Sequence, residues 1–164
     1  MNLAWDDRNT IVANLFNPAF CGEVIRVVAK EYNKHTNTVF PYEFAFLVLP
    51  ILLHQETRAR MPRSVRTYFF VWVEDNDDLF YDFSKRTKGM VKYTKEALLF
   101  LLLYKKIVLD ENGGIVTSQD RVIKIDNVDH LELNHILQKA QMLGKWLSAS
   151  SDVKSIYSFF RITP

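Results

Sequence analysis

The chain of 164 residues is 48% hydrophobic and 24% charged, with a formal net charge of +2. This length suits a single domain with one core, and the charge is too small to indicate a nucleic-acid-binding protein, which usually has a pI above about 9. The single cysteine excludes an internal disulfide, and the first seven residues lack the basic and apolar segments expected of a signal peptide. The longest apolar runs, 44–53 and 97–103, fall short of the roughly 20 residues that cross a bilayer. We expect a cytoplasmic protein without a membrane span, folded as one domain over residues 1–164.

The first helix is expected from Pro18 to about Tyr32. Asn17 can accept bonds from free backbone amides at the helix start, and proline at the first helical position loses no intrahelical bond. An apolar stripe should face the core, while four charged residues are expected to face outward: Glu23, Arg26, Lys30 and Glu31.

A second helix should open at Pro41. Its body, 44–53, is apolar on every side, which is typical of a helix in the middle of a domain. These first two helices make up the expected helical region 17–54.

A winged-helix core is predicted over about residues 64–117. Helices are expected at 64–72 and 79–90 and from Thr94, a candidate N-cap, to Leu103. The β-branched and aromatic residues of 65–73 leave a strand as the alternative to the first of these helices. Two β-branched segments, 107–109 and 115–116, flank Asn112-Gly113, which suits the positive φ angles of a hairpin turn. A helix followed directly by a hairpin is the second half of a winged helix.

The C-terminal region, about 128–160, is expected to pack around that core. A short strand is predicted near 120–126, then a long helix over 128–147 in which Gly144 lets another backbone come close, and a last helix, 153–160, capped by Asp152. The predicted fold class is therefore mainly α with a small β-hairpin wing.

Catalytic motifs are missing from the sequence. It has no phosphate-binding glycine loop, no nucleophile elbow and no pair of histidines spaced for a metal. The acidic group Asp75, Asp77 and Asp78 is explained by helix capping. We expect no enzyme, cofactor or metal, and an enzyme centred on Cys21 or His54 is the weakest alternative.

Two basic clusters are the candidate binding residues. The first contains Arg58, Arg60, Arg63 and Arg66; the second contains Lys85, Arg86, Lys88, Lys92 and Lys95, of which Lys88 and Lys92 are the main candidates. They could contact DNA phosphates or an acidic partner surface.

The segment 97–103, which precedes the hairpin, has no hydrophilic side. A helix that reads DNA bases needs polar side chains for the major groove. If this segment is buried on all sides, the fold serves as a scaffold. A stand-alone DNA-binding regulator remains the alternative.

Several stretches, in order along nearly the whole chain, resemble one family: Asn17–Cys21, Phe46–His54, Glu56–Arg58, Met61–Pro62, Thr94–Phe100, Leu143–Trp146, Ile156–Tyr157 and Pro164. The chain is similar to the middle components of three-component ABC-type systems, including the small accessory subunit of Lamassu-type antiviral defence. The resemblance implies a non-catalytic winged-helix subunit that docks on an SMC-like ATPase and holds an effector, often a nuclease, silent until foreign DNA is sensed. Any DNA contact would then be indirect and phosphate-mediated. The polar loop 33–38 and the ending 159–162 depart from the family pattern, which leaves the subtype open.

Overall fold

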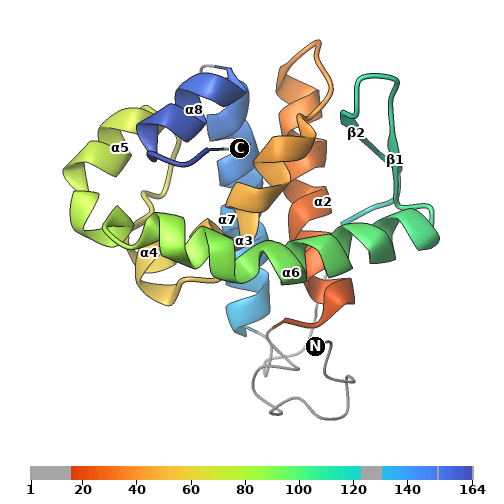
Figure 1. Ribbon diagram of the computed structural model, residues 1–164, viewed down its shortest axis with the longest axis horizontal. Helices are drawn as coiled ribbons and strands as arrows, with labels where there is room; N and C mark the ends of the chain where they lie inside the picture. Colours follow the sequence, from red (N-terminus) through yellow and green to blue (C-terminus); the bar gives the residue numbers. More distant parts are fainter. Residues whose placement is uncertain (1–15, 123–130, 151, 164) are drawn as a thin grey trace.

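The computed structural model describes residues 16–122, 131–150 and 152–163. Helices α2 (Pro18–His35) and α7 (Leu131–Ser148) lie at the centre, and the long helix α6 (Phe83–Leu103) crosses in front of α2 and α3 (Ala45–Leu52) (Figure 1). The hairpin of β1 (Ile107–Leu109) and β2 (Ile115–Thr117) projects at the end of α6 (Figure 1). Helices α5 (Phe69–Asp75) and α8 (Val153–Phe159) lie near the beginning of α6 (Figure 1). The predicted fold class, mainly helical with a two-stranded antiparallel hairpin, is confirmed.

Helix α2, Pro18–His35, begins where the sequence predicts. The Asn17 side chain accepts a hydrogen bond from the Ala19 amide at 2.8 Å, and Pro18 occupies the first turn. The expectation for its charged face is wrong for three of four residues, because Glu23, Arg26 and Glu31 are buried and only Lys30 stays partly exposed.

The second predicted helix is split into a short 3-10 turn, Tyr42–Phe44, and helix α3, Ala45–Leu52. All residues of α3 except Phe46 are buried, so the prediction of a central core helix is confirmed. Helix α4, Gln55–Arg60, follows directly.

The helices expected between 64 and 103 are arranged differently. Helix α5 spans Phe69–Asp75, a 3-10 turn spans Asp77–Phe80, and a single helix α6 spans Phe83–Leu103. The predicted break before Thr94 is absent, and Thr94 is fully buried inside α6. Nothing from Lys85 to Leu103 stops a helix strongly, since one exposed glycine costs only about 1 kcal/mol.

The hairpin consists of β1, Ile107–Leu109, and β2, Ile115–Thr117, with Val108 opposite Val116. The Asp110 side chain accepts bonds from the amides of Asn112 and Gly114, and Gly113 takes the positive φ of 81° that the turn requires. On the other side of β2, the Ile115 amide donates to the Phe40 carbonyl at 2.7 Å.

The hairpin packs against a helix that the sequence does not predict beside it. Helices α2 and α3 pack against α6, and α2 also contacts β2. The helices in contact with the hairpin are α2 and α6, and α3 packs against both of them, whereas the sequence predicts companions of the hairpin within 64–103.

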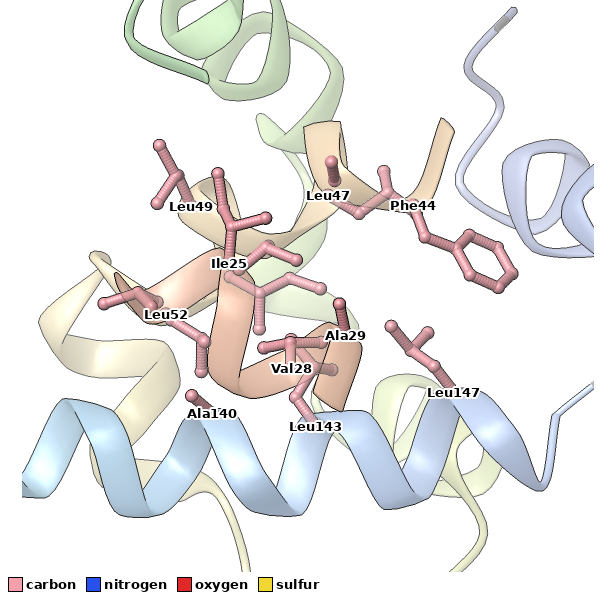
Figure 2. Close-up of a cluster of buried hydrophobic side chains, with 14 of the residues drawn as sticks. Ile25, Val28, Ala29, Phe44, Leu47, Leu49, Leu52, Ala140, Leu143 and Leu147 are labelled. Carbon is pink, nitrogen blue, oxygen red and sulfur yellow. The ribbon is translucent and has the colours of Figure 1, made fainter. Parts of the chain in front are cut away.

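The core is centred on the crossing of α2 with α7, Leu131–Ser148 (Figure 2). Val28 points toward Leu143 there, and Ala140 and Leu147 project from the same side of α7 (Figure 2). A Cβ atom on Gly144 would lie 2.6 Å from the Val28 carbonyl oxygen, so the prediction of a close backbone approach is confirmed.

The last helix, α8, spans Val153–Phe159 and is capped by Asp152, whose side chain accepts from the Ser155 amide. Its C-cap residue, Phe160, belongs to an aromatic cluster with Phe69, Trp72, Phe80, Phe83 and Trp146. The predicted strand near 120–126 and the start of the helix predicted at 128 fall largely outside the described residues; the described part, 120–122, is not a strand.

Candidate binding surface on helix α6 and the hairpin

Arg58 is not available to a ligand. It is 3% exposed, donates to the Leu52 carbonyl at 2.7 Å, and forms an ion pair with Glu132 of α7 at 2.6 Å. Burial lowers the pKa of its guanidinium, an effect that the Glu132 carboxylate opposes. The prediction that Arg58 contacts phosphates is wrong, because this side chain fastens α4 to α7.

The rest of the first basic cluster is also divided. Arg60 pairs with Asp78 at 2.7 Å and with Glu56 at 2.8 Å, so its charge is already compensated. Arg63 and Arg66 lie on the loop between α4 and α5, exposed and without an ion pair in the described part of the chain. The structure thus leaves two of the four arginines as candidates.

The second basic cluster forms a continuous surface on α6. Four of its members are exposed and make no ion pair with any residue that the structure describes: Lys85, Lys88, Lys92 and Lys95. Spacings of three and four residues place them on one side of the helix. Arg86 differs, because it turns inward and donates to the Leu79 carbonyl at 2.8 Å.

The same helix ends in exposed leucines. Ala97, Leu98 and Leu101 face the core, whereas Leu99, Leu102 and Leu103 are 57%, 38% and 70% exposed. The possibility that 97–103 is buried on all sides is therefore wrong: α6 lies across the surface and has an outer side.

Exposed apolar residues continue from α6 into the hairpin. We call the following residues the wing patch: Leu99, Leu102, Leu103, Tyr104, Val108, Leu109 and Val116. Each is at least 37% exposed. Concentrated apolar exposure of this kind is typical of a protein interaction site. The hairpin tip carries Asp110 and Glu111, whose charge would repel a phosphate backbone.

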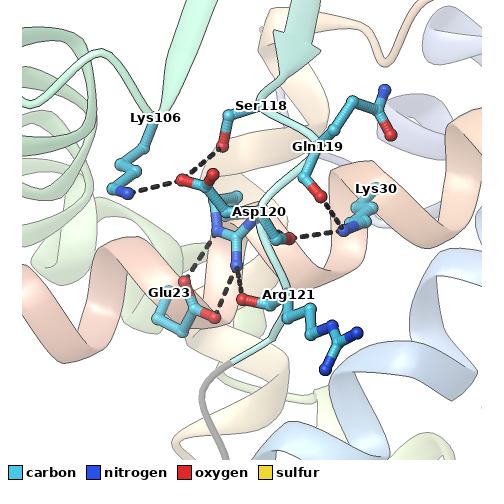
Figure 3. Close-up of polar contacts among 8 residues, drawn as sticks. Glu23, Lys30, Lys106, Ser118, Gln119, Asp120 and Arg121 are labelled. Carbon is cyan, nitrogen blue, oxygen red and sulfur yellow. Dashed lines mark hydrogen bonds and ion pairs between the residues drawn. The ribbon is translucent and has the colours of Figure 1, made fainter.

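A polar cluster fixes the chain beyond β2 (Figure 3). Arg26, 2% exposed, makes two bonds to the Glu23 carboxylate, at 2.7 and 2.8 Å, and donates to the backbone carbonyls of Asp120 and Arg121. Lys106 binds the Asp120 carboxylate. The bonds from Arg26 to these carbonyls fasten the segment after β2 to α2. The donors of this cluster therefore already have acceptors within the chain.

Cys21 and His54 are the two alternatives for an enzymatic centre. The first is a buried core residue, and the second is the N-cap of a helix. Burial raises the pKa of the Cys21 thiol to about 12, so the thiolate is disfavoured. His54 caps α4, its Nδ1 accepting from the Thr57 amide. Burial, with the charges of nearby arginines, lowers the pKa of His54.

A cavity of about 440 Å³ lies between α3, α6 and the chain after α8. Phe46, Thr87, Lys88 and Tyr157 are among its lining residues. Neither histidine nor cysteine is among the described residues that line it, so its hydroxyl groups have no activating base of that kind.

Two further features are absent from residues 16–122, 131–150 and 152–163: a metal site and a helix that could span a membrane. No cluster of three acidic, histidine or cysteine residues could hold a metal ion there. None of the helices in these ranges combines the length and apolar character of a membrane span.

The chain matches no curated protein and no solved structure. A family model does match, over residues 5–164: Middle Component 3 of the ABC-three component (ABC-3C) systems. The match covers the wing patch, the lysine face of α6 and the core, and the chain belongs to this family, whose members are accessory components of multi-component ABC systems.

Proposed function

We propose that this protein is a non-catalytic subunit that docks on an SMC-like ABC ATPase and couples DNA sensing to an effector in prokaryotic defence of the Lamassu type. The family supports the coarser part, since a middle component has partner components, one of them ATPase-like. The observation that carries docking is the wing patch.

The wing patch supports docking because its exposure is costly without a partner. Complete burial of a large apolar side chain contributes about 1.5–3 kcal/mol, and these residues remain substantially exposed. Interface cores are enriched in such groups. A subunit that is permanently bound to a partner would keep this apolar surface.

Co-expression with the other two components tests the proposal. We expect a stable complex on size exclusion, which Leu103→Asp disrupts. Leu131→Asp is the matched control, because Leu131 is 69% exposed against 70% for Leu103 but lies on α7, outside the wing patch. Free migration of this chain while the other two components associate would reject docking.

A stand-alone DNA-binding regulator is the second candidate, favoured by the unpaired lysines of α6 with Arg63 and Arg66. It predicts strongly salt-dependent binding of duplex DNA by the isolated protein. No mobility shift at low salt would reject it.

A further inference from the structure

The outer side of α6 has a regular pattern along its whole length. Six of its exposed residues follow one another in steps of three and four, and we call them the α6 stripe: Lys85, Lys88, Lys92, Lys95, Leu99 and Leu102. The first four are lysines and the last two are leucines. The stripe is thus divided along the helix axis into a basic part and an apolar part.

Alternating steps of three and four residues are the spacing with which one helix meets another along a seam. From Lys85 to Leu102 the stripe extends for about 26 Å at 1.5 Å per residue. The opposite side of α6 is already used, since Phe83, Thr87, Ala97 and Leu101 are buried against the core. Within the described part of the chain, no element covers the stripe.

We propose that the α6 stripe binds one helix of a partner component, which presents acidic residues to the four lysines and apolar residues to Leu99 and Leu102. This inference rests on the proposed function and specifies its docking contact. Opposite charges along such a seam select the partner and its orientation. The leucines supply the apolar burial, which the lysines alone cannot provide.

A nucleic acid fits the stripe less well. A DNA backbone presents negative charge at every step, so it would match the lysines but leave Leu99 and Leu102 against phosphates. The acidic hairpin tip, Asp110 and Glu111, lies beyond this apolar end.

A membrane surface fits less well too. A helix lying in a lipid interface needs an apolar face along its length with the polar face opposite. In α6 the exposed side changes from lysine to leucine along the axis, and the other side is in the core.

Charge reversal in the reconstituted three-component complex tests this contact. Lys92→Glu with Lys95→Glu should weaken association at least tenfold. The control, Arg63→Glu with Arg66→Glu, makes the same change of charge on exposed residues of another element and should stay within twofold of the unaltered protein. Unfolding temperatures of the two variants show that each is folded.

Photo-cross-linking groups at positions 88 and 102 identify the occupant. We expect both to attach to one helix of a partner component, about 14 residues apart, with acidic residues near the first attachment and apolar residues near the second. Attachment to two separate elements, attachment to DNA, or equal weakening by the control variant would overturn the inference. If the Lys92→Glu, Lys95→Glu variant still forms the complex, the inference about the stripe is overturned but the proposed function stands. If the three components never associate, the proposed function is overturned as well.

Discussion

Replacing Gly144 by alanine should separate the two central helices. A Cβ atom at this position would lie 2.6 Å from the Val28 carbonyl oxygen, 2.8 Å from Glu31 Cβ and 3.1 Å from the Tyr32 amide nitrogen. Two of these three atoms belong to the backbone of α2, so they cannot rotate away as a side-chain end would. The helices must move apart by several tenths of an ångström.

Two effects of opposite sign decide the result. Alanine favours a helix over glycine by about 1 kcal/mol, whereas forcing an extra carbon into a packed core costs about 1–3 kcal/mol. The second effect should be at its upper end, because the crossing of α2 with α7 is the most extensive contact between elements of the fold. We expect Gly144→Ala to lower the free energy of unfolding by about 2 kcal/mol, which corresponds to a fall in Tm of about 4–8 °C for a domain of this size.

Gly89→Ala is the matched control. Gly89 is exposed on α6, and a Cβ atom there would meet nothing within 4 Å. Only the higher helix propensity of alanine applies there, so this variant should have a free energy of unfolding about 0.5–1 kcal/mol higher than the unaltered protein. Urea denaturation and thermal unfolding followed by circular dichroism measure both variants. A Gly144→Ala variant as stable as the unaltered protein, or a destabilised Gly89→Ala variant, would refute the reasoning.

Three other predictions concern groups that the structure buries fully or in part. Glu132→Gln should cost about 1–3 kcal/mol in urea denaturation, since it removes the charged partner of buried Arg58; unchanged stability would mean that solvent compensates this charge. Cys21, with its pKa raised to about 12, should resist alkylation in the folded protein and react fully in concentrated guanidinium. Rapid labelling under native conditions would contradict its burial. For His54, the lowered pKa means that the folded state favours the neutral ring. Its contribution to stability is therefore present above the ordinary pKa of 6.5 and is lost as the pH falls through the lower folded value. His54→Asn keeps a capping side chain that does not titrate, so urea denaturation at a series of pH values should show a smaller loss in acid for this variant than for the unaltered protein.

Features set by neighbouring residues could be predicted from the sequence. The start of α2 follows from Asn17-Pro18, the hairpin from the turn at Asn112-Gly113, and the cap of α8 from Asp152. In each case the deciding interactions are between groups no more than four residues apart. Local chemistry is therefore sufficient for these elements.

Burial of charged residues could not be predicted in this way. Arg26 looks like a surface residue of an amphipathic helix, yet it is buried because backbone carbonyls 94 and 95 residues away accept its hydrogen bonds. Arg58 likewise depends on Glu132, 74 residues away. The proximity of these groups is a product of the tertiary fold, and no local pattern contains it.

The candidate surface was predicted in part. Lys88 and Lys92 lie together because a helix fixes their spacing, whereas Arg58 and Arg63 separate because α4 ends between them and the chain turns at Met61. Nearness in sequence therefore predicts a shared surface only where one helix continues through the residues concerned.

The exposure of Leu99, Leu102 and Leu103 is the step that links fold to function. In a winged helix that reads DNA, the helix before the hairpin offers hydrogen-bonding groups to base edges. Had these leucines been buried, this end of α6 would only fill the core. Because they are exposed, α6 presents an outer surface that can neither donate to nor accept from a base at its hairpin end. An apolar surface of this kind is stabilised when it packs against other apolar side chains. This favours a protein partner for α6, although the helix before the hairpin contacts DNA in winged helices that read bases.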